Sequence, residues 1–217
     1  MIDSDPNGPF RYPVSDIRDQ DEATPGIMPS QTVGPYVHIG LTWPGAENMV
    51  EEGTDGAVEV TFQVTDGAGH LIKDAMIEIW QAGSDGVYPS PLDPRAGEDA
   101  GREGFRGLGR GMCDSETGLV TFRTVRPGAV PAPDGGTEAP HLKVGVFARG
   151  MLERLYTRLY FPEQSEANDA DPVLNAVPVE RRDLLVASTV DGDADSYRMD
   201  IVMQHEDATR ETPFFAL

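Results

Sequence analysis

Hydrophobic and polar residues alternate along several short stretches of the chain, which is the pattern of a strand buried on one face. Every second position is Val or Phe in residues 58–64, and Tyr, Met or Ile in residues 196–204. Further strands are predicted at residues 75–81, 118–125, 142–148 and 155–161. Because turn residues separate most of these strands, the pattern predicts a mainly β protein built as a two-sheet antiparallel β-sandwich.

One short helix is expected near the C-terminus. Residues 173–187 carry the only clear helix signal, since Pro178 suits a first helical turn and Val179, Leu184 and Leu185 supply apolar positions. The helix is therefore expected to follow the main set of strands and to precede the last one.

The remaining segments are expected to be arms and loops. Residues 1–28 are polar and acidic with Pro and Gly, so they predict an extended N-terminal arm that buries little by itself. Residues 29–41 mix hydroxyl, Gly-Pro and apolar residues and are expected to lie extended on another surface. Residues 83–118 are expected to be one long loop, and loops of that length are usually functional or without fixed structure. We therefore divide the chain into the arm, residues 1–28, and one β-sandwich domain, residues 29–217.

The charge of the chain limits its partners. Its 217 residues carry a formal net charge of −20, from 37 acidic residues against 17 Lys and Arg. This balance argues against binding nucleic acid, which needs clustered cations, and against an anionic membrane surface. An anionic substrate would need a local basic pocket, and Arg149, Arg154 and Arg158 form the most basic stretch near a predicted strand.

Cysteine usage and hydropathy indicate the compartment. The single cysteine, Cys113, excludes an internal disulfide and is interpreted as a small apolar residue. The first residues lack the basic start and apolar run of a secretory signal. No stretch approaches the ~18 consecutive apolar residues of a membrane span. A cytoplasmic protein is therefore expected.

Residues 126–150 contain the most informative candidate site. A loop rich in Pro and Gly leads into His141, and a predicted strand follows at once. Such a loop can deliver a histidine to a metal or substrate site, but the residue two positions on is Lys143, whose ammonium has no lone pair to give a metal. Two interpretations stay open: His141 serves a site, or it is a loop histidine bonded to the backbone. Trp80, in another predicted strand, is interpreted as a core residue because of its size.

Five motifs between Pro29 and Phe161 carry a family resemblance: PSQTVGPYVHIGL, IEIWQAGSDGVY, FRTVRPG, APHLKVGVFARG and LYTRLYF. Together they resemble the intradiol ring-cleavage dioxygenases. The resemblance is strongest to the alpha-type chains of members that consist of alpha and beta subunits and act on protocatechuate, 3,4-dihydroxybenzoate. It implies a two-sheet antiparallel β-sandwich, in agreement with the strand pattern.

The resemblance also implies a reaction and a cofactor. Such enzymes use O2 to open the ring between the two hydroxyl-bearing carbons, giving 3-carboxy-cis,cis-muconate. Their Fe(III) is held by two Tyr and two His of the beta subunit, and anionic phenolate oxygen suits this hard ion. The ligand positions fall here on Tyr88, Val130, His141 and Lys143, and an arginine of the beta subunit falls on Glu138. With Val and Lys in the set, the chain is not expected to bind iron, so a beta-subunit partner in an alpha-beta assembly is implied.

By the same resemblance, this chain walls the substrate pocket at its interface with the beta subunit. The implied wall residues are Thr32, Gly34, Pro35, Tyr36 and Arg149. A cation such as Arg149 suits a carboxylated substrate, although the same arginine also fits a surface ion pair. Two other functions stay open: a self-sufficient homo-oligomeric intradiol dioxygenase, and a non-enzymatic β-sandwich binding module.

Overall fold

The computed structural model describes residues 34, 36–96, 104–133 and 135–216. The predicted N-terminal arm, residues 1–28, therefore lies outside the described residues, as do Thr32 and Pro35. Within the described ranges, no helix is long and apolar enough to cross a membrane.

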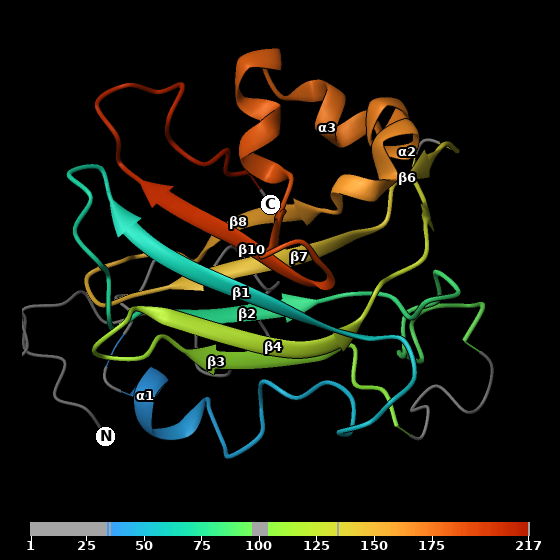
Figure 1. The fold of residues 1–217 in the computed structure, drawn as a ribbon, viewed down its shortest axis with the longest axis horizontal. Coiled ribbons are helices and arrows are strands. Elements are labelled where there is room, and N and C mark those ends of the chain that lie inside the picture. The colour runs from blue at the N-terminus through green and yellow to red at the C-terminus, as the bar shows by residue number, and fades with distance from the viewer. Residues whose placement is uncertain (1–33, 35, 97–103, 134, 217) are drawn as a thin grey trace, which may run out of the picture. The chain divides into compact units, whose positions relative to one another are not determined.

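In the described part of the chain, two four-stranded sheets form the β-sandwich (Figure 1). The first sheet, in the order β4-β1-β10-β9, consists of β1 (Ala57–Asp66), β4 (Leu119–Val125), β9 (Ser188–Val190) and β10 (Asp193–Met203). The second, in the order β3-β2-β7-β8, consists of β2 (Met76–Trp80), β3 (Leu108–Met112), β7 (His141–Phe147) and β8 (Leu155–Tyr160). A separate short ribbon pairs β5 (Val130–Pro131) with β6 (Thr137–Glu138). Neighbouring strands run antiparallel, apart from the parallel pair β1 and β10, so the predicted mainly β, two-sheet fold is confirmed.

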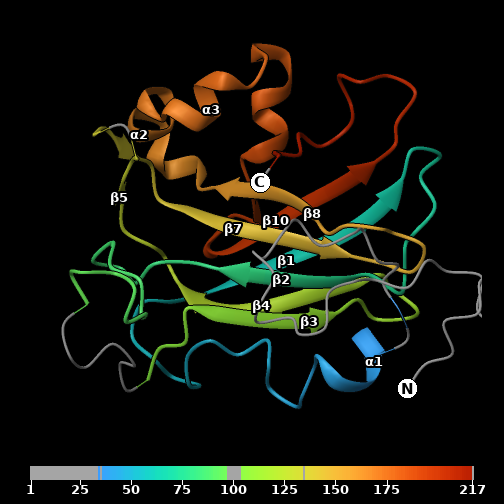
Figure 2. The same ribbon diagram turned by 180° about the vertical axis from the view of Figure 1, so that it is seen from behind.

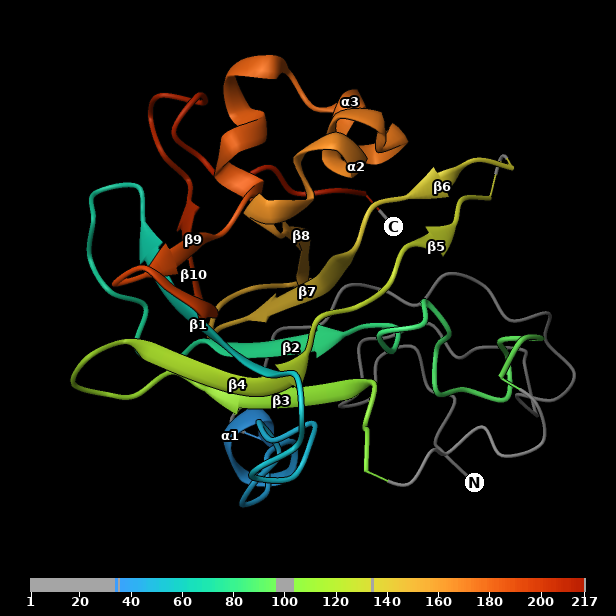
Figure 3. The ribbon, with the colours of Figure 1, turned by 45° about the vertical axis from the view of Figure 1, so that its right-hand side comes forward.

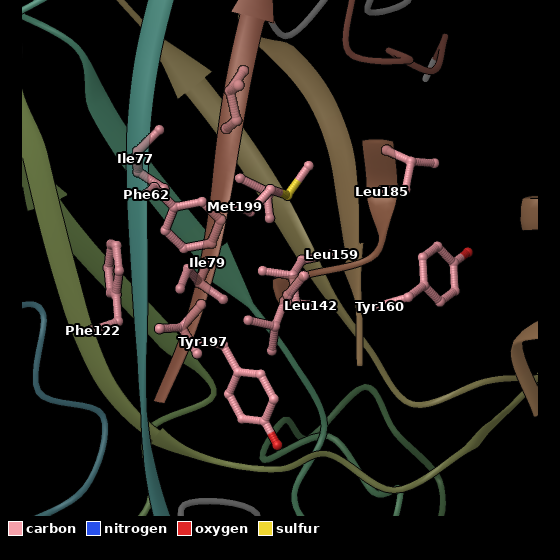
Figure 4. Close-up of a cluster of buried hydrophobic side chains, with 14 of the residues drawn as sticks. Phe62, Ile77, Ile79, Phe122, Leu142, Leu159, Tyr160, Leu185, Tyr197 and Met199 are labelled. Carbon is pink, nitrogen blue, oxygen red and sulfur yellow. The ribbon is translucent and has the colours of Figure 1, made fainter. Parts of the chain in front are cut away.

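The core lies between the two sheets, where the alternation of the strands places their apolar side chains (Figure 4). Phe62 of β1 and Phe122 of β4 are fully buried and meet edge to face, with ring centroids 5.9 Å apart. Ile77 and Ile79 of β2 and Leu142 of β7 join them from the second sheet. Since burial of each such side chain contributes roughly 1.5–3 kcal/mol, the interface between the sheets is the main source of stability.

Strand β3 is the longest of the strands that the alternation pattern did not reveal, the others being β5, β6 and β9. It lies in the segment expected to be one long loop, residues 83–118. Its sequence, LGRGM, has Gly at both buried positions, and glycine is depleted in strands. A Cβ on Gly111 would lie 2.4 Å from Val120, and one on Gly109 would lie 2.9 Å from Met49. The glycines therefore allow β3 to pass close to neighbouring segments.

The helical segments are short. They are α1 (Tyr36–Gly40), η2 (Pro162–Gln164), α2 (Ser165–Ala170), α3 (Pro172–Ala176) and η3 (Val179–Leu185). In Figure 3, α2 and α3 lie above β8 and next to β6.

Two helix predictions need correction. The region predicted as one helix, residues 173–187, is divided into α3 and η3. Val177, between them, is extended at φ −80 and ψ 137, because the following Pro178 disfavours helical backbone in the residue before it. The expectation of an extended segment at residues 29–41 was wrong for the described residues 36–40, which form α1.

Asp171 ties these helices to the second sheet. Its fully buried carboxylate caps α3 by accepting hydrogen bonds from the backbone N–H groups of Val173 at 2.9 Å and Leu174 at 2.7 Å. It also accepts from the backbone N–H of Ala139 at 2.7 Å and from the Tyr160 hydroxyl at 3.0 Å. One carboxylate therefore holds together α3, the end of β8 and the segment that leads into β7.

We expect Asp171→Asn to lower the free energy of unfolding by roughly 2–4 kcal/mol, because a neutral amide accepts fewer of these bonds and hydrogen bonds to a charged group contribute about 1.5–3 kcal/mol each. Asp169→Asn is the matched control, since Asp169 is an exposed carboxylate in the neighbouring helix α2. Urea unfolding followed by circular dichroism measures both variants. Equal stability of the two would contradict the role given to Asp171.

Candidate functional site

Three of the four positions that correspond to ligands in the family face one cleft. Tyr88, Val130 and Lys143 line a cleft of about 540 Å³. Tyr88 follows β2, Val130 begins β5 and Lys143 lies in β7, so the fold brings together residues that are far apart in the sequence. His141 is only 3% exposed and is not among the residues that line this cleft.

Trp80 forms one wall of the cleft, and its interpretation as a core residue was wrong. Ile77 and Ile79 occupy the core-facing side of β2, so the alternation places Trp80 on the opposite face. Its ring stacks on Tyr88, with centroids 5.6 Å apart and an interplanar angle of 12°. Strand register puts Trp80 directly opposite Lys143 of β7. The sheet thus fixes one edge of the cleft.

Lys143 supplies a positive charge to the cleft. Its ammonium lies 5.0 Å from the centroid of the Tyr88 ring, a distance at which a cation and a π system attract each other. Burial lowers the pKa of Lys143, and the nearby positive charge of Arg158 lowers it further, while Glu138 opposes the shift. The positive charge of the ammonium is therefore only partly balanced by negative charge nearby.

A buried ion pair lies beside the cleft. Glu138 of β6 and Arg158 of β8 are each 8% exposed in their side chains, and Arg158 Nη1 lies 2.9 Å from Glu138 Oε2. Arg158 also donates to the Tyr160 hydroxyl at 3.4 Å. The sequence placed Glu138 where the beta subunit has an arginine, but it did not indicate that Arg158 would face it, because β6 and β8 are separated in the sequence.

His141 is held by the backbone. Its Nδ1–H donates to the carbonyl of Ala139 at 2.7 Å, which confirms the interpretation as a backbone-bonded histidine, although the residue begins strand β7 instead of lying in a loop. Its Nε2 has no hydrogen-bond partner among the described residues and lies 3.6 Å from Glu138 Oε2. Burial, together with the positive charge of Arg158, lowers the pKa of His141 to about 4, so the ring is neutral at neutral pH.

The four positions do not fit a ferric ion. Val130 offers only methyl groups, and the Lys143 ammonium would repel a cation. Burial and the negative charge of Glu138 raise the pKa of Tyr88 to about 12, which disfavours the phenolate that a ferric ion binds best. His141 Nε2 has a lone pair, but it lies 3.6 Å from the carboxylate of Glu138. With methyl groups and an ammonium at two of the four positions, these side chains do not make up the ligand set that the family's ion needs.

The three arginines considered for a basic pocket do not form one. Arg149 lies 2.6 Å from Asp74 and Arg154 lies 3.5 Å from Glu78, both through ion pairs. Arg158 pairs with Glu138 in the buried position described above. Each guanidinium thus lies next to a different carboxylate, and Arg154 shares Glu78 with Arg110, which lies 2.7 Å from it.

The implied substrate wall and the cleft lie at opposite ends of the sheets. Helix α1 and the β7–β8 turn, which contains Arg149, are at one end, while the segment after β2 and the β5–β6 ribbon are at the other (Figures 1 and 2). Tyr36 and Ile39 of α1 are 77% and 72% exposed. Gly34 is half-buried, and Thr32 and Pro35 lie outside the described residues. Of the residues predicted to form the wall, the described ones are Gly34, Tyr36 and Arg149, and Tyr36 is an exposed aromatic side chain.

Known proteins resemble this chain over most of its length. A family model described as dioxygenase matches residues 36–205. The protocatechuate 3,4-dioxygenase alpha chain of Pseudomonas putida is 38% identical over 200 residues, which cover 86% of this chain and 94% of that one. The beta chain of the corresponding enzyme of Burkholderia cepacia is 30% identical over 218 residues, covering 93% and 86%. The solved dioxygenase domain of a dioxygenase–carbohydrate-binding fusion from Streptomyces sp. SirexAA-E has a TM-score of 0.53 at 24% identity, covering 82% of this chain and 97% of that chain, which supports the fold.

The neutral state of His141 predicts a pH dependence of stability. Because its pKa is about 4 in the folded chain against 6.5 as the ordinary value, the unfolded chain binds a proton between these values that the folded chain does not. Stability should therefore fall as the pH drops through this window. His141→Phe should remove about 2 kcal/mol of the loss between about pH 7.5 and pH 5.

Urea unfolding of wild type and His141→Phe at a series of pH values measures this difference. His70→Asn is the control, since the His70 side chain is 81% exposed. Parallel pH profiles for wild type and His141→Phe would show that the buried imidazole does not set the dependence.

Proposed function

Since this chain belongs to the intradiol ring-cleavage dioxygenase family, we propose that it is the alpha chain of a protocatechuate 3,4-dioxygenase. The greater identity to an alpha chain, 38%, than to a beta chain, 30%, supports this assignment. The observation that carries it is the state of the ligand positions. With Val130 and Lys143 in the set, the chain has the family fold but not the means to hold the family's metal.

The metal would then belong to a beta chain, which would hold the ferric ion in an alpha-beta assembly. The assembly would cleave protocatechuate between its hydroxyl-bearing carbons, and both atoms of O2 would enter the product, 3-carboxy-cis,cis-muconate. The enzyme would act in the cytoplasm. This chain would contribute the wall of the pocket and not the reacting centre.

The wall would be formed by Thr32, Gly34, Pro35, Tyr36 and Arg149. The exposure of Tyr36, 77%, supports this role, because a large aromatic side chain open to solvent is suited to a partner surface. Arg149 is also largely exposed, at 73% of its side chain, and gives Asp74 one described hydrogen bond, from Nε. Since a guanidinium has five N–H donors, donors are left for the carboxylate of protocatechuate.

Two alternatives predict different behaviour of the purified chain. A self-sufficient homo-oligomeric dioxygenase would need iron in this chain, which Val130 and Lys143 oppose. A non-enzymatic binding module would need no beta chain. We assign residues 1–28 to the arm and residues 29–217 to the domain in all three cases.

Without a beta chain, the full chain should purify with no stoichiometric iron, no tyrosinate-to-iron colour and no O2 uptake with protocatechuate. Co-expressed with a beta chain from the same source, it should co-purify in equal amounts and confer protocatechuate-dependent O2 uptake. Metal analysis, visible absorbance and an oxygen electrode measure these outcomes, with the beta chain alone as control. An iron-loaded active homo-oligomer would establish the first alternative, and an inactive chain that never pairs would establish the second.

In the assembled enzyme, Arg149→Ala should raise KM for protocatechuate about tenfold or more at unchanged iron content, because a hydrogen bond that involves charge contributes about 1.5–3 kcal/mol. Arg210→Ala, an exposed arginine in the C-terminal segment, is the matched control. Steady-state kinetics on both variants provide the measurement. Wild-type constants for Arg149→Ala would remove Arg149 from the pocket wall.

A further inference from the structure

The cleft that holds Tyr88, Val130 and Lys143 has no part in the function proposed above, yet it has the dimensions of a ligand site. Its volume is about 540 Å³, and small-molecule sites typically measure about 300–1,000 Å³. Most of its wall is aromatic or apolar, contributed by Trp80, Tyr88, Leu92, Pro94, Val130 and Pro131. Such a wall suits a planar apolar body more than a hydrated ion.

Among the described charged groups that line the cleft or lie beside it, one cation has no paired carboxylate. Arg95 binds Asp93 through two hydrogen bonds, of 3.0 and 2.7 Å, and Arg158 is paired with Glu138 at 2.9 Å. Lys143 has no carboxylate within ion-pair distance among the described residues, and its one described contact is with the face of the Tyr88 ring. In a chain whose net charge is −20, a half-buried ammonium without a counter-ion marks a place for an anion.

Tyr88, whose ring centroid lies 5.0 Å from this ammonium, adds a hydrogen-bond donor. Its hydroxyl makes no hydrogen bond within the part of the chain that the structure describes, and a tyrosine phenol is protonated at neutral pH. A protonated phenol beside an ammonium can donate to the same oxyanion. The two groups that face the cleft therefore supply complementary contacts to one acidic group.

We propose that this cleft binds a small aromatic carboxylate, with the carboxylate against the Lys143 ammonium and the Tyr88 hydroxyl and the ring against Trp80 and Val130. A metal ion does not suit the cleft because Lys143 repels it. A phosphate dianion suits it less than a carboxylate, because Lys143 is the one cation of the described cleft lining that lacks a paired carboxylate. The bound anion supplies the negative charge that Lys143 lacks among the described residues.

The site lies within this chain and does not depend on a beta chain, so it can be tested whether or not the proposed function holds. In a Trp43→Phe background, Trp80 is the only tryptophan of the chain, and its emission reports directly on the cleft. The probe is benzoate, titrated into the full chain at neutral pH. Benzamide, which has the same shape without the charge, is the ligand control.

Benzoate should change the Trp80 emission saturably, and Lys143→Met should weaken its binding about tenfold or more, as expected for loss of a charge-assisted hydrogen bond. Lys73→Met is the matched control, because Lys73 is the only other lysine and is exposed. Thermal unfolding shows that each variant is folded.

Three results would overturn the inference: no saturable binding of benzoate in the millimolar range, equal affinity for wild type and Lys143→Met, or equal affinity for benzoate and benzamide. In the complex with a beta chain, equilibrium dialysis should find a benzoate site that Lys143→Met removes, separate from any benzoate bound in the pocket for protocatechuate. Failure of this removal, with the complex itself active, would overturn the inference while leaving the proposed function intact.

Discussion

The buried ion pair between Glu138 and Arg158 governs the electrostatics of the region in which the family holds its metal. A charge taken out of water costs several kcal/mol unless a partner compensates it, and here two strands supply the partners: β6 carries Glu138 and β8 carries Arg158. Burial is the largest cause of the pKa shifts in this region, and the ion pair adds to it. The Arg158 guanidinium further lowers the pKa of His141 and of Lys143, and the Glu138 carboxylate further raises that of Tyr88. Burial and the ion pair together therefore disfavour the anionic phenolate that a ferric site needs.

The sequence was sufficient for the parts of the fold that depend on local periodicity. Strands β1 and β10 alternate over most of their length, so both were found, although β10 begins at Asp193, before the predicted residue 196. Strand β3 was missed because its two buried positions are Gly109 and Gly111, which carry no hydrophobic signal and are explained only by what lies next to them. The helix at residues 173–187 was drawn too long, because its apolar spacing continues through Val177, where Pro178 breaks the backbone pattern.

The candidate site was predictable only in part, for a similar reason. The motifs gave the four ligand positions, and three of them do share one cleft. The alternation of β2 already places Trp80 on the face opposite to Ile77 and Ile79. The interpretation of Trp80 as a core residue relied on its size, and the alternation was the better guide. The partner of Glu138 could not be found from the sequence, because β6 and β8 are not neighbours in the chain and their approach depends on the packing around Asp171 and Tyr160.

These contacts explain how the fold persists without a metal. In a member of the family that binds iron, the ion would bond the side chains at the four ligand positions and thereby hold the segment after β2, the β5–β6 ribbon and β7 together. In this chain protein contacts hold these segments: Tyr88 stacks on Trp80 of β2 and lies against Lys143 of β7, and Glu138 of β6 pairs with Arg158 of β8. Losing ligands without such replacements would leave several buried polar groups unpaired, at about 1–3 kcal/mol each. The described region keeps two such atoms at this place, His141 Nε2 and Arg158 Nε. Most of the former coordination space is therefore filled by contacts within the protein, and the Lys143 ammonium remains without a paired carboxylate among the described residues.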